Sequence, residues 1–351
     1  MTTKVGSGST PKGGNAVYTS AGHCFVRSQN VGMGYLILDE IAHINDVIHQ
    51  KHKATELKED DVLLNITGAS IGRTAIATKE IEGGNVNQHV CIIRANSKVN
   101  PKFLCNYIQT KKIQNYIQSL QTGGSREGLN FEQIRSFPIS LPNIAEQNKI
   151  AQLLDKLNER IATQNKIIDK LKSLIKGIAQ KIVHSNKPNV RLAECLECKS
   201  STLQESEVCE QGTYPVYGAN GIVGYLDNYS MEGEAVYIIK DGSGVGTVSY
   251  VTGKCSATGT LNTLQAKEGY SLQYFYYLLK VFNFEPYKTG MAIPHIYFKD
   301  YGKAKVFCPS YTEQLQYARL LYAIESKLSI EKKILTSLSL QKQYLLRQMF
   351  I

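Results

Sequence analysis

The chain contains one segment twice, at a constant offset of 167 residues and without a gap. Six residues of the first copy, Phe131, Pro142, Glu146, Gln147, Leu153 and Leu154, correspond to Phe298, Pro309, Glu313, Gln314, Leu320 and Leu321 in the second. A chain of 351 residues is long enough for two domains that each bury a core. The repeat therefore predicts two related globular domains, each followed by the repeated segment.

The repeated segment continues as a long helix in both copies. Its apolar residues alternate at steps of three and four, which is the heptad pattern of a helix that packs on another helix. The predicted contact positions are Leu154, Leu157, Ile161, Ile168, Leu171 and Ile178 in the first helix, and Leu321, Ile324, Leu328, Leu335, Leu338 and Leu345 in the second. Gln164 and Glu331 interrupt the two seams at equivalent positions, and Lys342 interrupts the second seam again. We expect the helices to pack on each other, antiparallel if a two-fold pseudo-axis relates the copies.

Short runs rich in β-branched residues, broken by glycine turns, precede each helix. The expected strands are Asp61–Ile66, Thr74–Thr78, His89–Arg94, Glu234–Ile239 and Gly246–Val251, and the expected short helices are Pro101–Gln118 and Ser271–Phe284. The fold class is therefore α+β, with two mixed α/β domains and an antiparallel coiled coil. The predicted boundaries are 1–143 and 185–310 for the domains and 144–184 and 311–351 for the helices, with a linker at 184–189.

Charge and composition narrow the class of partner. The formal net charge of +10, from 40 basic and 30 acidic residues, favours a polyanion. Two domains held apart by a helical spacer suit a long, regular ligand, and DNA is the first to consider. The sequence has neither an apolar run long enough to cross a bilayer nor a signal peptide, so we expect a cytoplasmic protein. The eight cysteines include only one CxxC pair, which predicts reduced thiols and no zinc site.

Glycine-rich loops in both halves carry hydroxyl, amide and basic side chains. None fits a nucleotide-binding pattern, but such loops allow close approach to phosphates and base edges. The candidate DNA-binding residues are Ser9, Thr10, Lys12, Arg27, Ser70, Arg73, Asn87, Gln88, Ser125 and Arg126 in the first half, and Tyr217, Asn220, Lys240, Ser243, Lys254, Lys288 and His295 in the second. His89, beside Gln88, is interpreted as a structural histidine.

Catalytic patterns are missing from the sequence. It contains neither the tetrapeptide with which amino-methyltransferases hold a flipped base nor a methyl-donor fingerprint. The acidic cluster Glu56, Glu59, Asp60 and Asp61 is interpreted as a solvated turn, and the pair His49 and His52 as surface polar residues. A self-sufficient nuclease or methyltransferase is therefore disfavoured, and no catalytic residue, metal ligand or cofactor is assigned to this chain.

The order of these motifs resembles the specificity subunit of type I restriction-modification systems over essentially the whole chain. The motifs are the Gly6–Pro11 loop, Asp61–Leu64 before Gly68–Arg73, Asn87–Val90, Ser125–Arg126 before Leu129–Phe131, and Pro142 with Glu146–Gln147. Tyr214–Gly221, Gly242–Gly246, and Pro309 with Glu313–Gln314 are similar elements in the second half.

The resemblance implies a non-catalytic subunit in which each domain reads one half of a split DNA site. The helices would set the spacing and dock two modification subunits, which carry S-adenosylmethionine and methylate adenine. Restriction subunits that use ATP with Mg could join them. The alternatives are a coiled-coil adapter that does not read DNA and a truncated, silent copy of a specificity subunit.

Two differences between the halves affect these expectations. Val190–Cys195 precedes the first loop of the second half, whereas the first half begins almost at its loop, so the opening segment usual in the family is short or missing. The second half has Ala292–His295 where the first has Arg126. The two domains should therefore prefer different half-sites.

Overall fold

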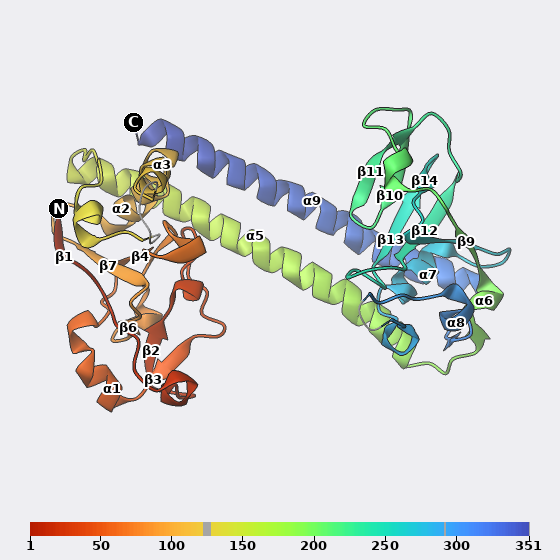
Figure 1. The fold of residues 1–351 in the computed structure, drawn as a ribbon, viewed down its shortest axis with the longest axis horizontal. Helices are drawn as coiled ribbons and strands as arrows, with labels where there is room; N and C mark the ends of the chain where they lie inside the picture. Colours follow the sequence, from red (N-terminus) through yellow and green to blue (C-terminus); the bar gives the residue numbers. More distant parts are fainter. Residues whose placement is uncertain (122–127, 291–292, 351) are drawn as a thin grey trace. The chain divides into compact units, whose positions relative to one another are not determined.

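The computed structural model describes residues 1–121, 128–290 and 293–350. The contacts divide the chain into two compact units (Figure 1). The first unit comprises Met1–Asn165 together with Ile334–Ile351, and the second comprises Lys166–Lys333. The first unit therefore combines the start and the end of the sequence.

A four-stranded antiparallel sheet forms the centre of the first unit. In spatial order its strands are β1 (Thr2–Ser7), β7 (Val90–Ala95), β4 (Val62–Asn65) and β5 (Thr74–Ile76). A smaller sheet has the order β3 (Ala42–Ile44), β2 (His23–Val26) and β6 (Asn85–Val86), with β2 parallel to β6. The short helices are α1 (Asp46–Lys51), α2 (Pro101–Ile108), α3 (Lys111–Ser119) and α4 (Phe131–Arg135).

The second unit repeats this topology strand for strand. Its larger sheet has the order β9 (Leu196–Ser200), β15 (Leu261–Ala266), β12 (Glu234–Ile239) and β13 (Val248–Thr252). Its smaller sheet has the order β11 (Gly221–Leu226), β10 (Tyr214–Gly218) and β14 (Ser256–Ala257), with β10 parallel to β14. Helices α7 (Leu272–Leu279) and α8 (Phe298–Tyr301) follow the sheets as α2 and α4 do. The predicted duplication of a mixed α and β domain is confirmed.

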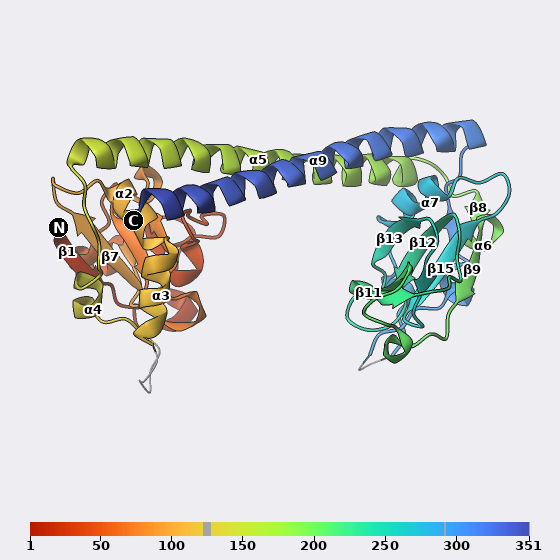
Figure 2. The same ribbon diagram turned by 90° about the horizontal axis from the view of Figure 1, so that it is seen from above.

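In the second unit a short strand and a helical turn precede β9, the first strand of the larger sheet. Strand β8 (Val190–Arg191) pairs antiparallel with β16 (Lys305–Val306), and α6 (Leu192–Cys195) follows it. In Figure 2, α6, β8 and β9 lie next to one another. In the first unit the equivalent large-sheet strand is β1, which begins at Thr2.

Alternate residues of the larger sheet in the first unit enter two separate cores. Leu64 and Ile93 join a core with α2 and α3, whereas Leu63 and Ile92 join a core that contains Val26 of the smaller sheet. Both faces of β4 are covered, so every residue of this strand is buried. This explains why Val62–Leu64 of β4 form a continuous apolar run rather than an alternating pattern.

The expected strands lie within two residues of their observed positions. The predicted helix Pro101–Gln118 is instead two helices, α2 and α3, because Thr110 begins a new helix. Its hydroxyl oxygen accepts a hydrogen bond from Ile113 N at 3.4 Å, in the usual manner of a threonine N-cap.

The two long helices are α5 (Ile144–His184) and α9 (Tyr311–Met349), and each belongs partly to each unit. In the first unit, Leu154 of α5 shares a core with Leu346 near the end of α9. Farther along α5, Gln164 lines one surface hollow with Leu338 of α9. Residue numbers along α5 therefore increase while those of the neighbouring residues of α9 decrease, so the two helical segments run antiparallel, as predicted.

None of the twelve predicted coiled-coil positions is exposed. Those fully buried are Leu154, Leu157, Ile168, Leu321, Leu328 and Leu338; those partly buried are Ile161, Leu171, Ile178, Ile324, Leu335 and Leu345. The polar interruptions differ from one another. Gln164 is buried, whereas Lys342 Nζ donates to Gln109 Oε1 at 3.0 Å, beside α2, and burial lowers the pKa of Lys342. Lys342 thus contacts the globular part of the first unit.

The repeated glutamine of the two copies joins each long helix to its domain. Gln147 Oε1 accepts from Asn100 N at 2.9 Å, and Gln314 Oε1 accepts from Ser271 N at 2.9 Å. Asn100 and Ser271 are the N-cap residues of α2 and α7. Each glutamine also donates from Nε2 to a proline carbonyl at 2.9 Å, Pro142 or Pro309 respectively. The repeated Pro and Gln are therefore parts of one structural junction, which is present in both units.

Replacing Gln147 with alanine should lower the free energy of unfolding of the first unit by about 2 kcal/mol, because it leaves buried backbone groups without partners. Gln314→Ala should have the same effect on the second unit. Hydrogen exchange of α2 and α7 measures the two effects separately. Gln152→Ala, at an exposed position of α5, is the matched control and should change stability by less than about 0.5 kcal/mol. An equally small effect of Gln147→Ala would contradict the junction.

Candidate functional site

Each unit presents a hairpin tip with the same backbone. In the first unit the tip between β4 and β5 is closed by Gly72 N donating to Asn65 O at 2.9 Å. In the second unit Gly246 N donates to Ile239 O at 2.9 Å between β12 and β13. Gly72 and Gly246 have φ values of 84° and 89°, in the left-handed region that favours glycine. The two glycine loops found in the sequence are therefore equivalent turns.

The same neighbouring segments flank the two tips. Ile66 N donates to His89 O at 3.0 Å and Ile66 O accepts from Leu129 N at 2.8 Å. Lys240 N donates to Thr260 O at 3.0 Å, and Lys240 O accepts from Ile296 N at 2.9 Å. These bonds make Ile66 and Lys240 equivalent, and they bring three loops together in each unit: the hairpin tip, the segment before β7 or β15, and the segment before α4 or α8.

In the first unit a chain of polar side chains connects these loops. Thr10 Oγ1 donates to Gln88 Oε1. Gln88 Nε2 lies 3.2 Å from His89 Nε2, and His89 Nδ1 lies 2.5 Å from Thr67 Oγ1. If the Gln88 amide donates to Nε2, the neutral imidazole carries its proton on Nδ1 and donates it to Thr67. These contacts orient the Gln88 amide but leave it a further donor and acceptor. The interpretation of His89 as a structural residue agrees with them.

The loop before β2 approaches this chain closely. Gly8 N donates to Asn87 O at 3.2 Å, and a Cβ at Gly8 would lie 1.6 Å from Val86 O. Only glycine therefore fits there. Ser9 Oγ lies 2.9 Å from His52 Nδ1.

The remaining candidates of the first unit differ in their burial and in the contacts that their polar groups already make within the protein. Asn87 is buried, and its Oδ1 accepts from His89 N at 3.1 Å, so it supports the backbone. The Arg27 guanidinium lies over the Tyr18 ring at 5.5 Å, and its Nε is buried without a hydrogen-bond partner among the residues described. Ser70 is half-buried in the hairpin tip. Ser125 and Arg126 lie outside the described residues.

Lys12 and Arg73 are exposed, and among the described residues neither has an ion-pair partner. Arg73 belongs to the hairpin tip, and Lys12 follows the loop that contacts Asn87. Of the described cationic candidates, these two are both exposed and without an ion-pair partner, so their charge is available to a polyanion.

The second unit has different side chains around the equivalent tip. His295 Nδ1 lies 2.6 Å from Asp241 Oδ1, and Gly242 N donates to Pro294 O at 3.0 Å, which fixes the segment before α8 on the tip. Lys240 is half-buried and lies close enough to Cys198 to oppose the effect of burial, which raises the pKa of that thiol to about 11. Ser243 is exposed in the tip.

The four remaining candidates of the second unit lie in different surroundings. Asn220 is exposed in the turn between β10 and β11, and Tyr217 packs on Tyr237 with ring centroids 5.5 Å apart. Lys288 Nζ lies 2.5 Å from Glu285 Oε1. Lys254 follows the end of β13 that is remote from the tip, where its Nζ lies 3.7 Å from Glu232.

Two of the sequence interpretations are wrong. Asp61 is not solvated: it is 1% exposed, and its carboxylate pairs with Arg94 at 2.7 Å, which raises the pKa of Arg94. His49 is not a surface residue: it is 4% exposed, stacks on His23 at 3.8 Å and hydrogen-bonds Asn85 Oδ1 at 2.8 Å. The sequence carried one signal for the burial of Asp61, because this residue immediately precedes an apolar strand.

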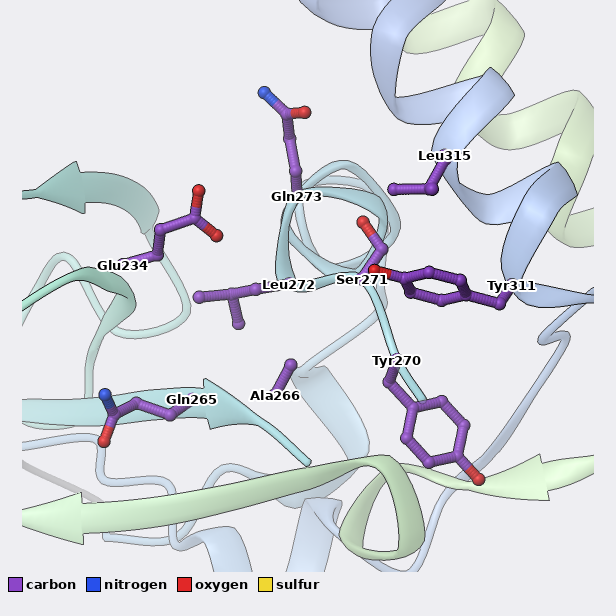
Figure 3. Close-up of a pocket in the computed structure, with 9 residues that line it drawn as sticks. All are labelled: Glu234, Gln265, Ala266, Tyr270, Ser271, Leu272, Gln273, Tyr311 and Leu315. Carbon is purple, nitrogen blue, oxygen red and sulfur yellow. The ribbon is translucent and has the colours of Figure 1, made fainter. Parts of the chain in front are cut away.

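A pocket of about 470 Å³ lies elsewhere in the second unit, between the sheet, α7 and the start of α9 (Figure 3). None of the predicted binding residues lines it. Its polar lining includes Glu234, Gln265 and Gln273, and Figure 3 shows the Tyr270 hydroxyl pointing away from the other labelled side chains. Within the described ranges there is no cluster of three or more potential metal ligands and no helix able to span a membrane.

Comparisons with known proteins agree on one family. The model of the type I restriction modification DNA specificity domain matches residues 12–173 and again 185–340. A curated protein of Mycoplasma genitalium, described as a type I specificity subunit, is 24% identical over 309 residues, covering 81% of this chain and 79% of that protein.

Solved structures share the fold. The crystal structure of a type I S subunit from M. genitalium aligns with a TM-score of 0.66 at 18% identity, covering 99% of this chain and 93% of that one. A chain from a structural study of complex assembly in the type I restriction-modification system aligns with a TM-score of 0.55 at 16% identity, covering 93% and 91%.

Proposed function

The chain belongs to the type I restriction-modification DNA specificity family, and from this membership we propose that its two units read the two halves of one split DNA target. The observation that carries the proposal is the pair of equivalent hairpin tips with different side chains. Thr67 and His89 of the first unit are replaced by Asp241 and Thr260 in the second. Two tips that share the same backbone but carry different hydrogen-bond donors and acceptors are suited to recognising two different base sequences.

Contact with phosphates would supply most of the affinity. Lys12 and Arg73 are exposed cations beside the polar chain of the first unit, and Lys240 lies at the tip of the second. Neutralised phosphates release counterions, so the affinity should fall steeply with salt. Recognition of the bases would then depend on side chains such as Ser243 and Gln88, and the amide of Gln88 is already oriented by its hydrogen bonds.

The long helices would dock two modification subunits. The repeated residues Leu153 and Leu320 are 45% and 50% exposed, although they lie next to the buried seam residues Leu154 and Leu321. Equivalent apolar residues on the outer faces of the two helices can offer the same contact to two copies of one partner. S-adenosylmethionine, and ATP with Mg for restriction, would be bound by partner subunits, and this chain would be a non-catalytic recognition subunit.

The test is adenine-methylation mapping in cells that carry the cognate modification subunit, with and without this chain. We expect a split motif that appears only with the chain. A chain with Ser243→Ala and His295→Ala should change one half of the motif and leave the other intact. If a stable complex forms but no motif appears, the adapter or silent-copy alternative holds instead. Methylation by the purified chain alone would contradict a non-catalytic role.

A further inference from the structure

The first unit has a long connection where the second unit has a two-residue turn. Residues 27–41 join β2 to β3, whereas only Ala219 and Asn220 join the equivalent strands β10 and β11. Residues 30–37 of the long connection form a small hairpin, which we name the inserted hairpin. The turn between β10 and β11 leaves no room for such an element, so it distinguishes the first unit from the second.

The inserted hairpin is closed by its own hydrogen bonds. At its turn, Gly32 N donates to Tyr35 O at 2.9 Å. At its base, Ile37 N donates to Asn30 O at 2.9 Å, and the buried Asn30 side chain donates from Nδ2 to Ile37 O at 2.9 Å. The conformation of the inserted hairpin is therefore fixed within the first unit before any ligand binds.

Further hydrogen bonds attach this connection to the hairpin tip between β4 and β5. Gly34 N donates to Thr74 O at 2.7 Å, and Asn65 Nδ2 donates to Ser28 O at 2.8 Å. Asn65 is fully buried, and its carbonyl oxygen also closes the hairpin tip. Arg73, an exposed cation of the tip, immediately precedes Thr74. The inserted hairpin is thus attached to the candidate DNA-binding site of the first unit.

The turn of the inserted hairpin presents two large apolar side chains to solvent. Met33 is 39% exposed and Tyr35 is 60% exposed. The Tyr35 ring lies against Gly32, because a Cβ at Gly32 would be 2.6 Å from Cε2 and Cζ of the ring. On the other glycine of the turn, a Cβ at Gly34 would be 2.6 Å from Gln109 Oε1. Close packing at both glycines therefore positions an aromatic ring that remains largely exposed.

The chemistry of this turn suits contact with bases rather than with phosphates. Its four residues, Gly-Met-Gly-Tyr at 32–35, carry no charge. Aromatic and methionine side chains pack on the apolar faces and edges of nucleobases, and proteins also insert such side chains between base steps. The exposed cation Arg73 on the attached tip is suited to a phosphate. The two neighbouring elements therefore combine a group for the DNA backbone with a group for a base.

We propose that the inserted hairpin is a DNA-contact element of the first unit, in which the Tyr35 ring packs against a base of the half-site that this unit reads. Arg73 binds a phosphate beside it. The inference rests on the proposed function and extends it, because it gives the first unit an apolar base contact for which the second unit has no equivalent element between β10 and β11.

The first test selects bound sequences from a pool of random duplexes, using the complex of the full chain with the cognate modification subunit. The variants are Tyr35→Ala, Tyr35→Phe and the matched control Tyr344→Ala, which removes an exposed tyrosine from α9. The unchanged chain should select a split motif. Tyr35→Ala should weaken the preference in one half only, the half that Ser243→Ala with His295→Ala leaves intact. Tyr35→Phe and Tyr344→Ala should keep both halves.

Fluorescence anisotropy with the selected duplex measures the size of the contact. Tyr35→Ala should lower the affinity about 10-fold, as expected for the loss of one contact between a base and an aromatic ring. The slope of log affinity against log salt should stay unchanged, because the ring neutralises no phosphate. Gly32→Ala, whose Cβ would displace the ring, should also lower the affinity without changing the slope.

Three results would contradict the inference, and they differ from one another. If Tyr35→Ala binds the selected split motif as tightly as the unchanged chain does, the inference is wrong and the proposed function stands. If Tyr35→Ala keeps its DNA affinity but binds less modification subunit, the inserted hairpin is a protein contact instead. If the unchanged chain selects no motif, the proposed function fails and the inference fails with it.

Discussion

Phe350→Ala is expected to lower the free energy of unfolding of the first unit by about 3 kcal/mol, as for other large-to-small substitutions in a core. Phe350 is 5% exposed, and its ring lies 5.0 Å from Phe103 and 5.1 Å from Tyr107 of α2. The residue follows α9, about 250 positions from α2 in sequence. Its removal would leave a cavity between the long helices and the first core, because the surrounding rings cannot fully collapse.

Urea unfolding of the full chain, followed by hydrogen exchange in α2, measures this loss. Tyr344→Ala is the matched control, since Tyr344 lies on the same helix but is 57% exposed. The control should change stability by less than about 0.5 kcal/mol. Protection of α7 in the second unit should stay unchanged in both variants. A loss below about 1 kcal/mol for Phe350→Ala would contradict the assignment of the chain's last residues to the first core.

Lys12→Ala combined with Arg73→Ala is expected to weaken DNA binding roughly 30-fold at physiological salt. A phosphate contact contributes a slope of about 0.9 in log affinity against log salt, which is about 5-fold per contact at 0.15 M. Both side chains are exposed and lack an ion-pair partner in the described structure, so neither charge is already satisfied. The salt slope itself should fall by about 1.8.

Fluorescence anisotropy with a labelled duplex, over a series of salt concentrations, gives both the affinity and the slope. The control is Lys58→Ala with Lys79→Ala, which removes the same charge from exposed positions at the other end of the β4–β5 pair. The control should bind almost as the unchanged protein does. If both double variants lose affinity equally, net charge rather than the hairpin tip determines binding.

Several elements of the fold could be predicted because their signals are local. The heptad spacing of α5 and α9 and the apolar runs of β4 and β12 reflect burial that repeats along a single element. The smaller sheets and β1 could not be predicted this way. Strand β1 contains one apolar residue, Val5, and its extended form follows from pairing with β7. The segment Pro101–Gln118 was predicted as one helix but forms two, because the cap at Thr110 begins a new helix within a continuous amphipathic pattern.

For the candidate site, too, the sequence could predict some features and could not predict others. Glycine, hydroxyl and amide residues marked the loops that the structure brings together, as at Ser9, Thr10 and Gln88. The sequence could not separate Lys254 from the other candidates, because its distance from the tip depends on the strand register. Nor could it show that Asp241 pairs with His295, 54 positions away.

By itself the sequence determined the duplication, the two long helices and their seam, since each follows from a period or an offset that neighbouring residues carry. The tertiary structure alone decided the contacts between distant residues. Asp61 is buried because Arg94 lies across the sheet, His49 because it stacks on His23, and Phe350 because α9 returns to the first core. Such contacts leave no periodic signal, because their energy depends on where the whole chain places the two partners.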